Sequence, residues 1–124
     1  MLAVTDPHEA YRRSALDARV QGGDTAALVI LCLEHAIGGL GLAQIAAGRG
    51  DSTQRSKALT KALTAVTALE MGVDRTAPLA DALLHVYGSA RKAVLDSVVR
   101  FDAAAVAAAR QDLMEIKGAL QGGA

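Results

Sequence analysis

Aromatic residues are nearly absent from this chain of 124 residues, since they make up only 2% of it and tryptophan is missing. The three aromatic side chains are Tyr11, Tyr87 and Phe101. A hydrophobic core must therefore be built from Leu, Val, Ile and Ala, and apolar residues reach 52% of the chain. Leu and Ala have high helix propensity, so this composition favours closely packed helices.

Cysteine and excess charge are also lacking. Cys32 is the only cysteine, so no internal disulfide can form, as is usual in a reducing cytoplasm. Lys and Arg number 13, and Asp and Glu number 13. No whole-molecule field therefore draws the chain to nucleic acid or to an anionic membrane. Because the N-terminal residues show no signal-peptide pattern either, we expect a cytoplasmic protein.

The longest apolar run covers residues 26–47 and reads AALVILCLEHAIGGLGLAQIAA. It is long enough to span a bilayer. However, Glu34 lies in its middle, where insertion is unfavourable, and no Trp or Tyr flanks either end. The other long helices are amphipathic and need an apolar partner in water. We therefore predict that this run is the most buried helix of a soluble bundle, with a membrane anchor as the alternative.

Helix start and stop signals divide the chain into one short and four long helices. Asp6, Pro7 and Glu9 predict a short helix to about Ala18. The long helices are expected at about 24–48, 51–71, 76–100 and 102–122, opened by Asp24, by Asp51 in a capping box with Gln54, by Thr76 with Pro78, and by Asp102.

Only a few residues connect each long helix to the next, which makes neighbouring helices antiparallel. The predicted fold class is therefore all-α: an antiparallel up-down-up-down four-helix bundle with a short extra N-terminal helix. Residues 1–124 form a single domain, in which residues 1–23 are an N-terminal cap segment and residues 24–121 are the bundle.

Apolar residues recur every three or four positions along the last three long helices, which predicts their core-facing sides. The three stripes are Leu59, Leu63, Val66 and Val73; then Leu79, Leu83, Val86, Ala90, Val94 and Val98; then Val106, Leu113, Ile116 and Leu120. In the first long helix Gly39, Ala43 and Ala47 fall four apart, and small residues there let another helix approach closely.

Two residue pairs carry groups that enzymes use, but neither predicts an active site. Cys32 and His35 share a helix face within an apolar helix, without a residue to orient the imidazole. Asp81 and His85 are four apart, yet helical di-metal sites need Glu-x-x-His motifs that this chain lacks. We therefore expect no enzyme activity, no metal and no cofactor.

Binding of a partner is better supported. Leu84, Leu95 and Val99 lie off the core stripe of the third long helix. They either line a groove for an amphipathic partner helix or pack under the N-terminal helix. The alanine-rich run at residues 103–109 likewise either packs inside the bundle or admits a neighbour on an outer face.

Segments from about Ala10 to Leu120 resemble the flagellar export chaperones of the FliS type. Ala10-Tyr11 is similar to the N-terminal tyrosine motif of that family, and residues 24–29 resemble its Ser-x-x-x-Leu-Val/Ile helix start. Residues 83–102 resemble its Leu-x-x-Leu-Tyr-x-Tyr-Met…Leu…Asp stretch, with Tyr87, Leu95 and Asp102 in register. The chain departs from the family pattern at His35, Ser89, Ala90, Ser97 and Val98.

The resemblance implies a cytoplasmic helical bundle that binds the disordered C-terminal segment of flagellin, prevents premature polymerisation and keeps flagellin competent for export. It implies neither catalysis nor a cofactor. The expected partner-binding residues are Tyr11, Leu84, Tyr87, Leu95 and Val99, with Tyr87 alternatively a bundle-edge residue whose hydroxyl is in water. A self-associating helical scaffold without a flagellin client is the alternative function, and a homodimer is left open.

Overall fold

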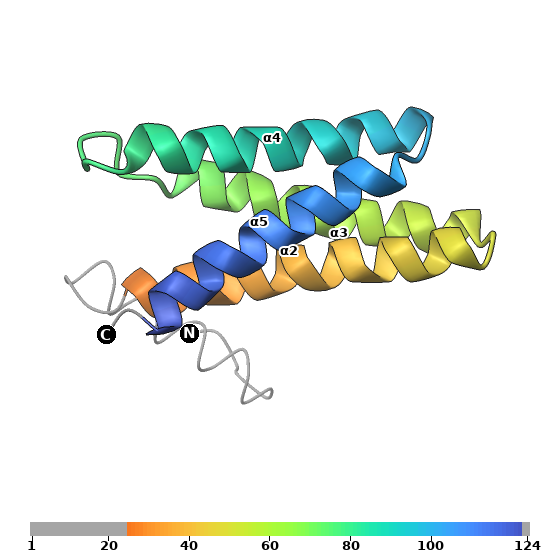
Figure 1. Cartoon of the computed structure of the whole chain (residues 1–124), viewed down its shortest axis with the longest axis horizontal. Coiled ribbons are helices and arrows are strands. Elements are labelled where there is room, and N and C mark those ends of the chain that lie inside the picture. Colours follow the sequence, from red (N-terminus) through yellow and green to blue (C-terminus); the bar gives the residue numbers. More distant parts are fainter. Residues whose placement is uncertain (1–24, 123–124) are drawn as a thin grey trace, which may run out of the picture.

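The computed structural model describes residues 25–122, which form four helices joined by short loops (Figure 1). Helix α2 covers Thr25–Gly48, α3 Ser52–Met71, α4 Ala80–Val99 and α5 Ala103–Gly122. The predicted N-terminal helix and the cap at Asp24 lie outside the described residues. The four predicted long helices are confirmed, with one changed boundary at the start of α4.

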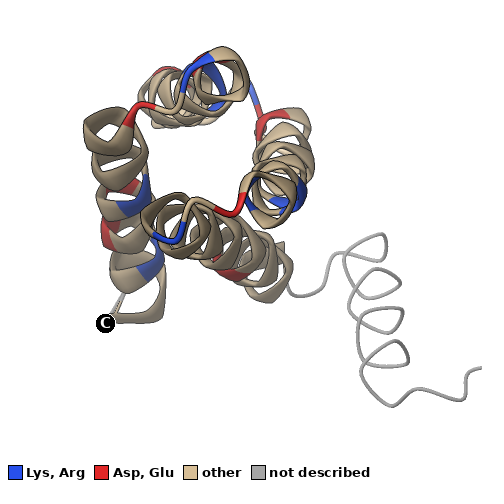
Figure 2. Cartoon of the chain, turned by 90° about the vertical axis from the view of Figure 1, so that its right-hand side faces the viewer, with Lys and Arg blue, Asp and Glu red and all other residues tan. Residues whose placement is uncertain are grey.

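The helices form an antiparallel ring. Helix α2 packs on α3, α3 on α4, α4 on α5, and α5 returns to α2. An end-on view shows the four helices around a common centre (Figure 2). Within residues 25–122 the diagonal pairs α2–α4 and α3–α5 make no close backbone approach. The all-α up-down-up-down bundle is confirmed, and each helix has two neighbours and one outer face.

The core consists of small and branched aliphatic side chains with one aromatic ring among them. Its fully enclosed large side chains are Leu33, Leu40, Leu59, Val66, Tyr87, Val94, Val106 and Leu113. Buried alanines fill the spaces between them, especially along α2 and α3. Burying such a set removes enough apolar surface from water to stabilise a bundle of this size without disulfides or metals.

Helices α2 and α3 approach most closely at Gly39. A Cβ atom built on Gly39 would lie 2.9 Å from the backbone nitrogen of Ala62 and 3.0 Å from the carbonyl oxygen of Ala58. Real side chains do not tolerate such distances to backbone atoms, so glycine is required here. The predicted close approach through Gly39 and Ala43 is confirmed, since both residues are buried.

Side-chain caps fix two of the helix starts. Asp51 Oδ1 accepts a hydrogen bond from the Gln54 backbone N–H at 3.0 Å, and Asp102 Oδ1 accepts one from that of Ala105 at 3.0 Å. In a capping box the Gln54 side chain would accept a hydrogen bond from the Asp51 backbone N–H. Here the Asp51 N–H donates instead to the Ala46 carbonyl oxygen at 2.9 Å. This tight turn passes through Gly50, whose positive φ of 68° suits glycine.

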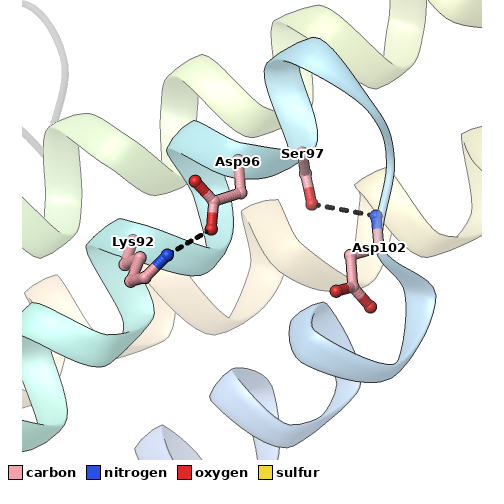
Figure 3. Close-up of polar contacts among 4 residues, drawn as sticks. All are labelled: Lys92, Asp96, Ser97 and Asp102. Atoms are coloured by element: carbon pink, nitrogen blue, oxygen red, sulfur yellow. Dashed lines mark hydrogen bonds and ion pairs between the residues drawn. The ribbon is translucent and has the colours of Figure 1, made fainter.

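A buried serine joins α4 to α5. Ser97 is almost fully enclosed, and its Oγ accepts a hydrogen bond from the Asp102 N–H at 3.2 Å (Figure 3). On the outer side of α4, the Lys92 Nζ lies 2.7 Å from Asp96 Oδ2, an ion pair one helical turn apart. Asp102 thus receives support on its backbone nitrogen while its carboxylate caps α5.

The start of α4 was predicted too early. The helix begins at Ala80, and the preceding Leu79 provides no side-chain cap. Thr76 instead belongs to a turn with Asp74, whose Oδ1 accepts hydrogen bonds from the Thr76 N–H at 3.0 Å and from its hydroxyl at 2.7 Å. These two hydrogen bonds lower the pKa of Asp74. The turn competes with the first helical turn and delays it.

Three ends of the predicted stripes were also wrong. Leu79 and Val98 are exposed, because Leu79 precedes the helix and Val98 lies in its last turn. The buried face of α4 instead includes Tyr87 and Ser97. Leu120, near the end of α5, is likewise exposed.

Helix α2 is not enclosed on all sides, contrary to its predicted position as the most buried helix. It is long and apolar enough to cross a membrane, but only 28% of its most apolar window is buried. Leu42 and Ile45 are 51% and 54% exposed. The core helix of a soluble protein and an N-terminal signal sequence can have the same length and hydropathy, so these two properties alone do not assign α2 to a membrane. The ring arrangement explains the exposure, because α2 has only two neighbours.

Candidate functional site

The described members of the predicted binding set fall into two environments. Tyr87 is 2% exposed and contributes to the core, so its ring offers no surface in this structure. Burial, followed by the nearby Cys32, raises its pKa. The alternative of a bundle-edge tyrosine in water is therefore wrong. Leu84 is half-buried, Leu95 is 44% exposed and Val99 is 90% exposed. Tyr11 lies outside the described residues.

The exposed members lie on the flank of α4 that faces α3. Arg91 of α4 marks this flank, because its Nε lies 2.8 Å from Oε1 of Glu70 on α3. Leu84 and Leu95 are seven positions before and four after Arg91, spacings that keep residues on one side of a helix. Val99 continues this side by another four residues. These residues form an apolar edge along the α3 side of α4.

The facing flank of α3 is rich in hydroxyl groups but carries little charge. Ser56, Thr60 and Thr67 fall at spacings of four and seven, with Glu70 three residues further on. The Thr60 hydroxyl donates to the Ser56 carbonyl oxygen at 3.0 Å, and Thr64 on the outer side likewise donates to that of Thr60. Such back-bonded hydroxyls are already satisfied within the helix. We call this surface the α3–α4 face; it comprises Ser56, Thr60, Thr67, Leu84, Leu95 and Val99.

A groove lies on the other side of α3, between α2 and α3. Its volume is about 360 Å³. We call it the α2–α3 groove; it is lined by Leu42, Ile45, Ala46, Arg49, Asp51, Gln54, Lys57, Ala58 and Lys61. None of the predicted binding residues within the described part of the chain lines it. The prediction that Leu84, Leu95 and Val99 contact a partner stays a prediction.

The sequence contained a signal for this groove that was missed. Leu31, His35, Gly38, Leu42, Ile45 and Arg49 alternate at spacings of four and three. That is the spacing of residues that form a seam between two helices. All six are partly or fully exposed; five lie on α2 and Arg49 follows it directly. An apolar helix with a second seam on its outer side was interpreted as a fully buried helix, because composition alone does not distinguish the two.

The residue pairs examined for chemistry lie apart from any larger cluster. His35, Asp81 and His85 are exposed, and Cys32 is half-buried. Within residues 25–122, no group of three or more His, Cys, Asp or Glu side chains is arranged to hold a metal ion.

The fold defines an antiparallel four-helix bundle with exposed apolar side chains on its outer faces. The model of the family described as flagellar protein FliS matches residues 7–122, so the chain belongs to the FliS family. This family consists of cytoplasmic export chaperones for flagellin rather than of enzymes. No curated protein matches the chain.

Proposed function

We propose that this protein is a cytoplasmic export chaperone. It binds the disordered C-terminal segment of flagellin, prevents premature polymerisation, and keeps flagellin competent for secretion through the flagellum. The observation that carries the proposal is the family match over residues 7–122 of the chain. The exposed apolar residues of the α3–α4 face support it, because a chaperone for a disordered segment needs unoccupied apolar surface.

The α3–α4 face is our candidate for the flagellin contact. Apolar turns of the flagellin segment would cover Leu95 and Val99, together with the exposed edge of Leu84. The ion pairs at this face and its outer edge, Glu70 with Arg91 and Lys92 with Asp96, are satisfied within the bundle, so the face favours an apolar ligand surface. The ligand loses chain entropy when it orders on the bundle, which keeps the affinity moderate and allows release.

We further propose that the segment 1–23, around Tyr11, covers part of this apolar surface when flagellin is absent. Flagellin would then displace it. Comparing the Tyr11→Ala variant with the wild type tests this role by titration calorimetry and size-exclusion chromatography. Tighter flagellin binding or increased self-association is expected. Equal affinity together with an equal oligomeric state would reject the covering role.

The main test uses a peptide from the C-terminus of the flagellin of the same organism. Titration calorimetry should give a dissociation constant of about micromolar or tighter, and circular dichroism should show added helix as the peptide orders. Leu95→Ser should weaken binding by roughly tenfold, the effect of losing one well-buried apolar contact. Met114→Ser is the matched control, since Met114 on α5 is 40% exposed, close to the 44% of Leu95. A folded protein that binds no peptide would reject the flagellin assignment.

The second candidate function is a self-associating scaffold with no flagellin client. The outer side of α5 favours it, because Ala103, Ala104, Ala107 and Ala108 are all exposed. Small side chains allow another helix to approach closely. Size-exclusion chromatography separates the candidates: the scaffold requires a stable homo-oligomer that the flagellin peptide does not disturb. A homodimer itself stays a prediction.

A further inference from the structure

Helix α2 presents more apolar surface than the bundle uses. Its inner side contacts α3 and α5, yet Leu42 and Ile45 on its outer side remain about half exposed. Gly38 lies between these residues and Leu31 on the same seam, and a Cβ atom there would meet only Lys61 Nζ, at 4.0 Å. The outer seam therefore has apolar anchors at both ends and an open position between them. This is the form of a surface that receives another helix.

Positive charge borders this surface along α3. Lys57 and Lys61 line the α2–α3 groove from α3, and Arg49 lines it at the end of α2. Within residues 25–122 no ion pair involves any of these three cations. Asp51 is the acidic residue that lines the groove, and its carboxylate caps α3.

The two lysines are themselves unfavourably placed for an isolated helix. Lys57 and Lys61 are four apart in α3, where like charges repel. On the other side of α2 the cations of α5 have partners, because Lys117 Nζ lies 3.4 Å from Glu34 Oε2 and Arg110 Nε donates to the Ile37 carbonyl oxygen at 3.4 Å. Within residues 25–122, the cations beside the seam that form no ion pair include Lys57 and Lys61. A ligand with one acidic edge would relieve the repulsion.

We propose that the α2–α3 groove binds an acidic amphipathic helix supplied by a second protein partner other than flagellin. The apolar side of that helix covers Leu42 and Ile45, and its acidic edge pairs with Lys57, Lys61 and Arg49. The ridge of α3 separates this groove from the α3–α4 face, so both surfaces can be occupied at once. A rod-shaped ligand suits a groove with cations along one edge better than a flat anionic membrane does.

The test uses two designed helical peptides of about three heptads each. Both carry leucine at the a and d positions; one carries glutamate and the other lysine at the positions beside them. Titration calorimetry on the full chain should show that the glutamate peptide binds at least about tenfold more tightly than the lysine peptide, with affinity falling as salt is added. Equal binding of the two peptides would overturn the proposal.

Variants then locate the site. Lys57→Glu/Lys61→Glu should weaken the glutamate peptide about tenfold, and Leu42→Gln/Ile45→Gln should weaken it by a similar factor. The single reversal Lys61→Glu should also weaken binding of the glutamate peptide. Its matched control is Arg75→Glu, which reverses one charge outside the groove, since Arg75 lies in the loop between α3 and α4. Circular dichroism confirms that each variant is folded. No loss of peptide affinity in folded groove variants would place the peptide elsewhere and overturn the proposal.

Two further measurements distinguish other ligands. The flagellin peptide should bind Lys57→Glu/Lys61→Glu within about twofold of wild type; an equal loss for both peptides would assign the groove to flagellin and overturn the proposal. If flagellin binds neither protein, the proposed function fails while the glutamate-peptide result still decides this inference. Sedimentation with phosphatidylglycerol vesicles tests a membrane ligand. Vesicle binding that the double reversal abolishes, without glutamate-peptide binding, would also overturn the proposal.

Discussion

The two flanks of α3 differ in how closely they pack against the neighbouring helix. Towards α2, the chain has Gly39 opposite Ala58 and Ala62, and the two backbones come into direct contact. Towards α4, the contact is less extensive and includes the ion pair between Glu70 and Arg91. Charge differs as well, since the outer border of the α2 side carries Lys57 and Lys61, which form no ion pair within residues 25–122, while the α4 side carries the paired Glu70 and Arg91. One helix thus presents two surfaces of different chemistry.

On α3, the size of the side chains determines where a neighbouring helix packs closely, and their charge determines which kind of ligand the remaining surface favours. Glycine and alanine bring α2 and α3 together at their inner sides, which leaves the larger Leu42 and Ile45 outside. On the other flank, the back-bonded Thr60 and the exposed Leu95 leave an apolar surface whose charges, Glu70 and Arg91, are paired with each other. We expect ligands of different charge on the two flanks.

The largest expected effect is a difference in unfolding free energy between substitutions on the inner side of α4 and on its α3-facing edge. Tyr87→Ala should lower the free energy of unfolding by about 3–5 kcal/mol, because it leaves a cavity at a fully enclosed position. Leu95→Ala should lower it by less than about 1 kcal/mol, since Leu95 is already 44% exposed. Urea denaturation measures both. Equal losses would show that both residues belong to one core.

The second prediction compares the two helix contacts through matched glycines. Gly39→Ala should lower the free energy of unfolding by about 1–3 kcal/mol, because the new methyl group would collide with the α3 backbone. Gly88→Ala, on the α4 flank, should be neutral or raise it by up to about 1 kcal/mol. Its Cβ atom would lie 3.9 Å from Oε2 of Glu70, an ordinary contact distance. Urea denaturation that shows the same sign for both variants would remove the claimed difference in packing.

The third prediction concerns pH. Burial raises the pKa of Tyr87 above its usual value of 10.0, so the unfolded chain ionises first as pH rises. The stabilisation from the neutral phenol is present below pH 10.0 and is lost as pH rises through the higher folded-state pKa. Tyr87→Phe should therefore make the loss of stability at alkaline pH less steep. Denaturation across this range, with tyrosinate absorbance to follow ionisation, measures the change; an unchanged slope would contradict the burial of the hydroxyl.

The smallest expected effect is that of the ion pair between α3 and α4. Glu70→Gln should lower the free energy of unfolding by less than about 1 kcal/mol, because the partner Arg91 side chain is 44% exposed. The difference should shrink in high salt, where the pair is screened. Thermal denaturation at two salt concentrations measures it. A larger, salt-independent loss would mean that this flank depends on polar contact as much as the α2 flank depends on close packing.

The sequence predicted the helices better than their outer surfaces. Caps at Asp51 and Asp102 act locally, so both helix starts were predicted correctly. Thr76 looked equally suitable, but Asp74 competes for its hydrogen bonds and α4 begins later. The core position of Tyr87 was missed because an aromatic residue with a hydroxyl fits an edge or an interior equally well by type. Leu42 and Ile45 were missed because an apolar helix gives no marker of its outer side.

The all-helical class, the limits of most helices and the family pattern can be predicted from the order of residues, because caps, spacing and composition act over a few residues. Which apolar residues are enclosed depends instead on how the helices pack against one another. In a ring of four helices each helix has two neighbours, so part of the apolar surface of α2 must face outward whatever its composition. The charges that border this surface come from α3, a separate helix, and only folding brings them beside Leu42 and Ile45.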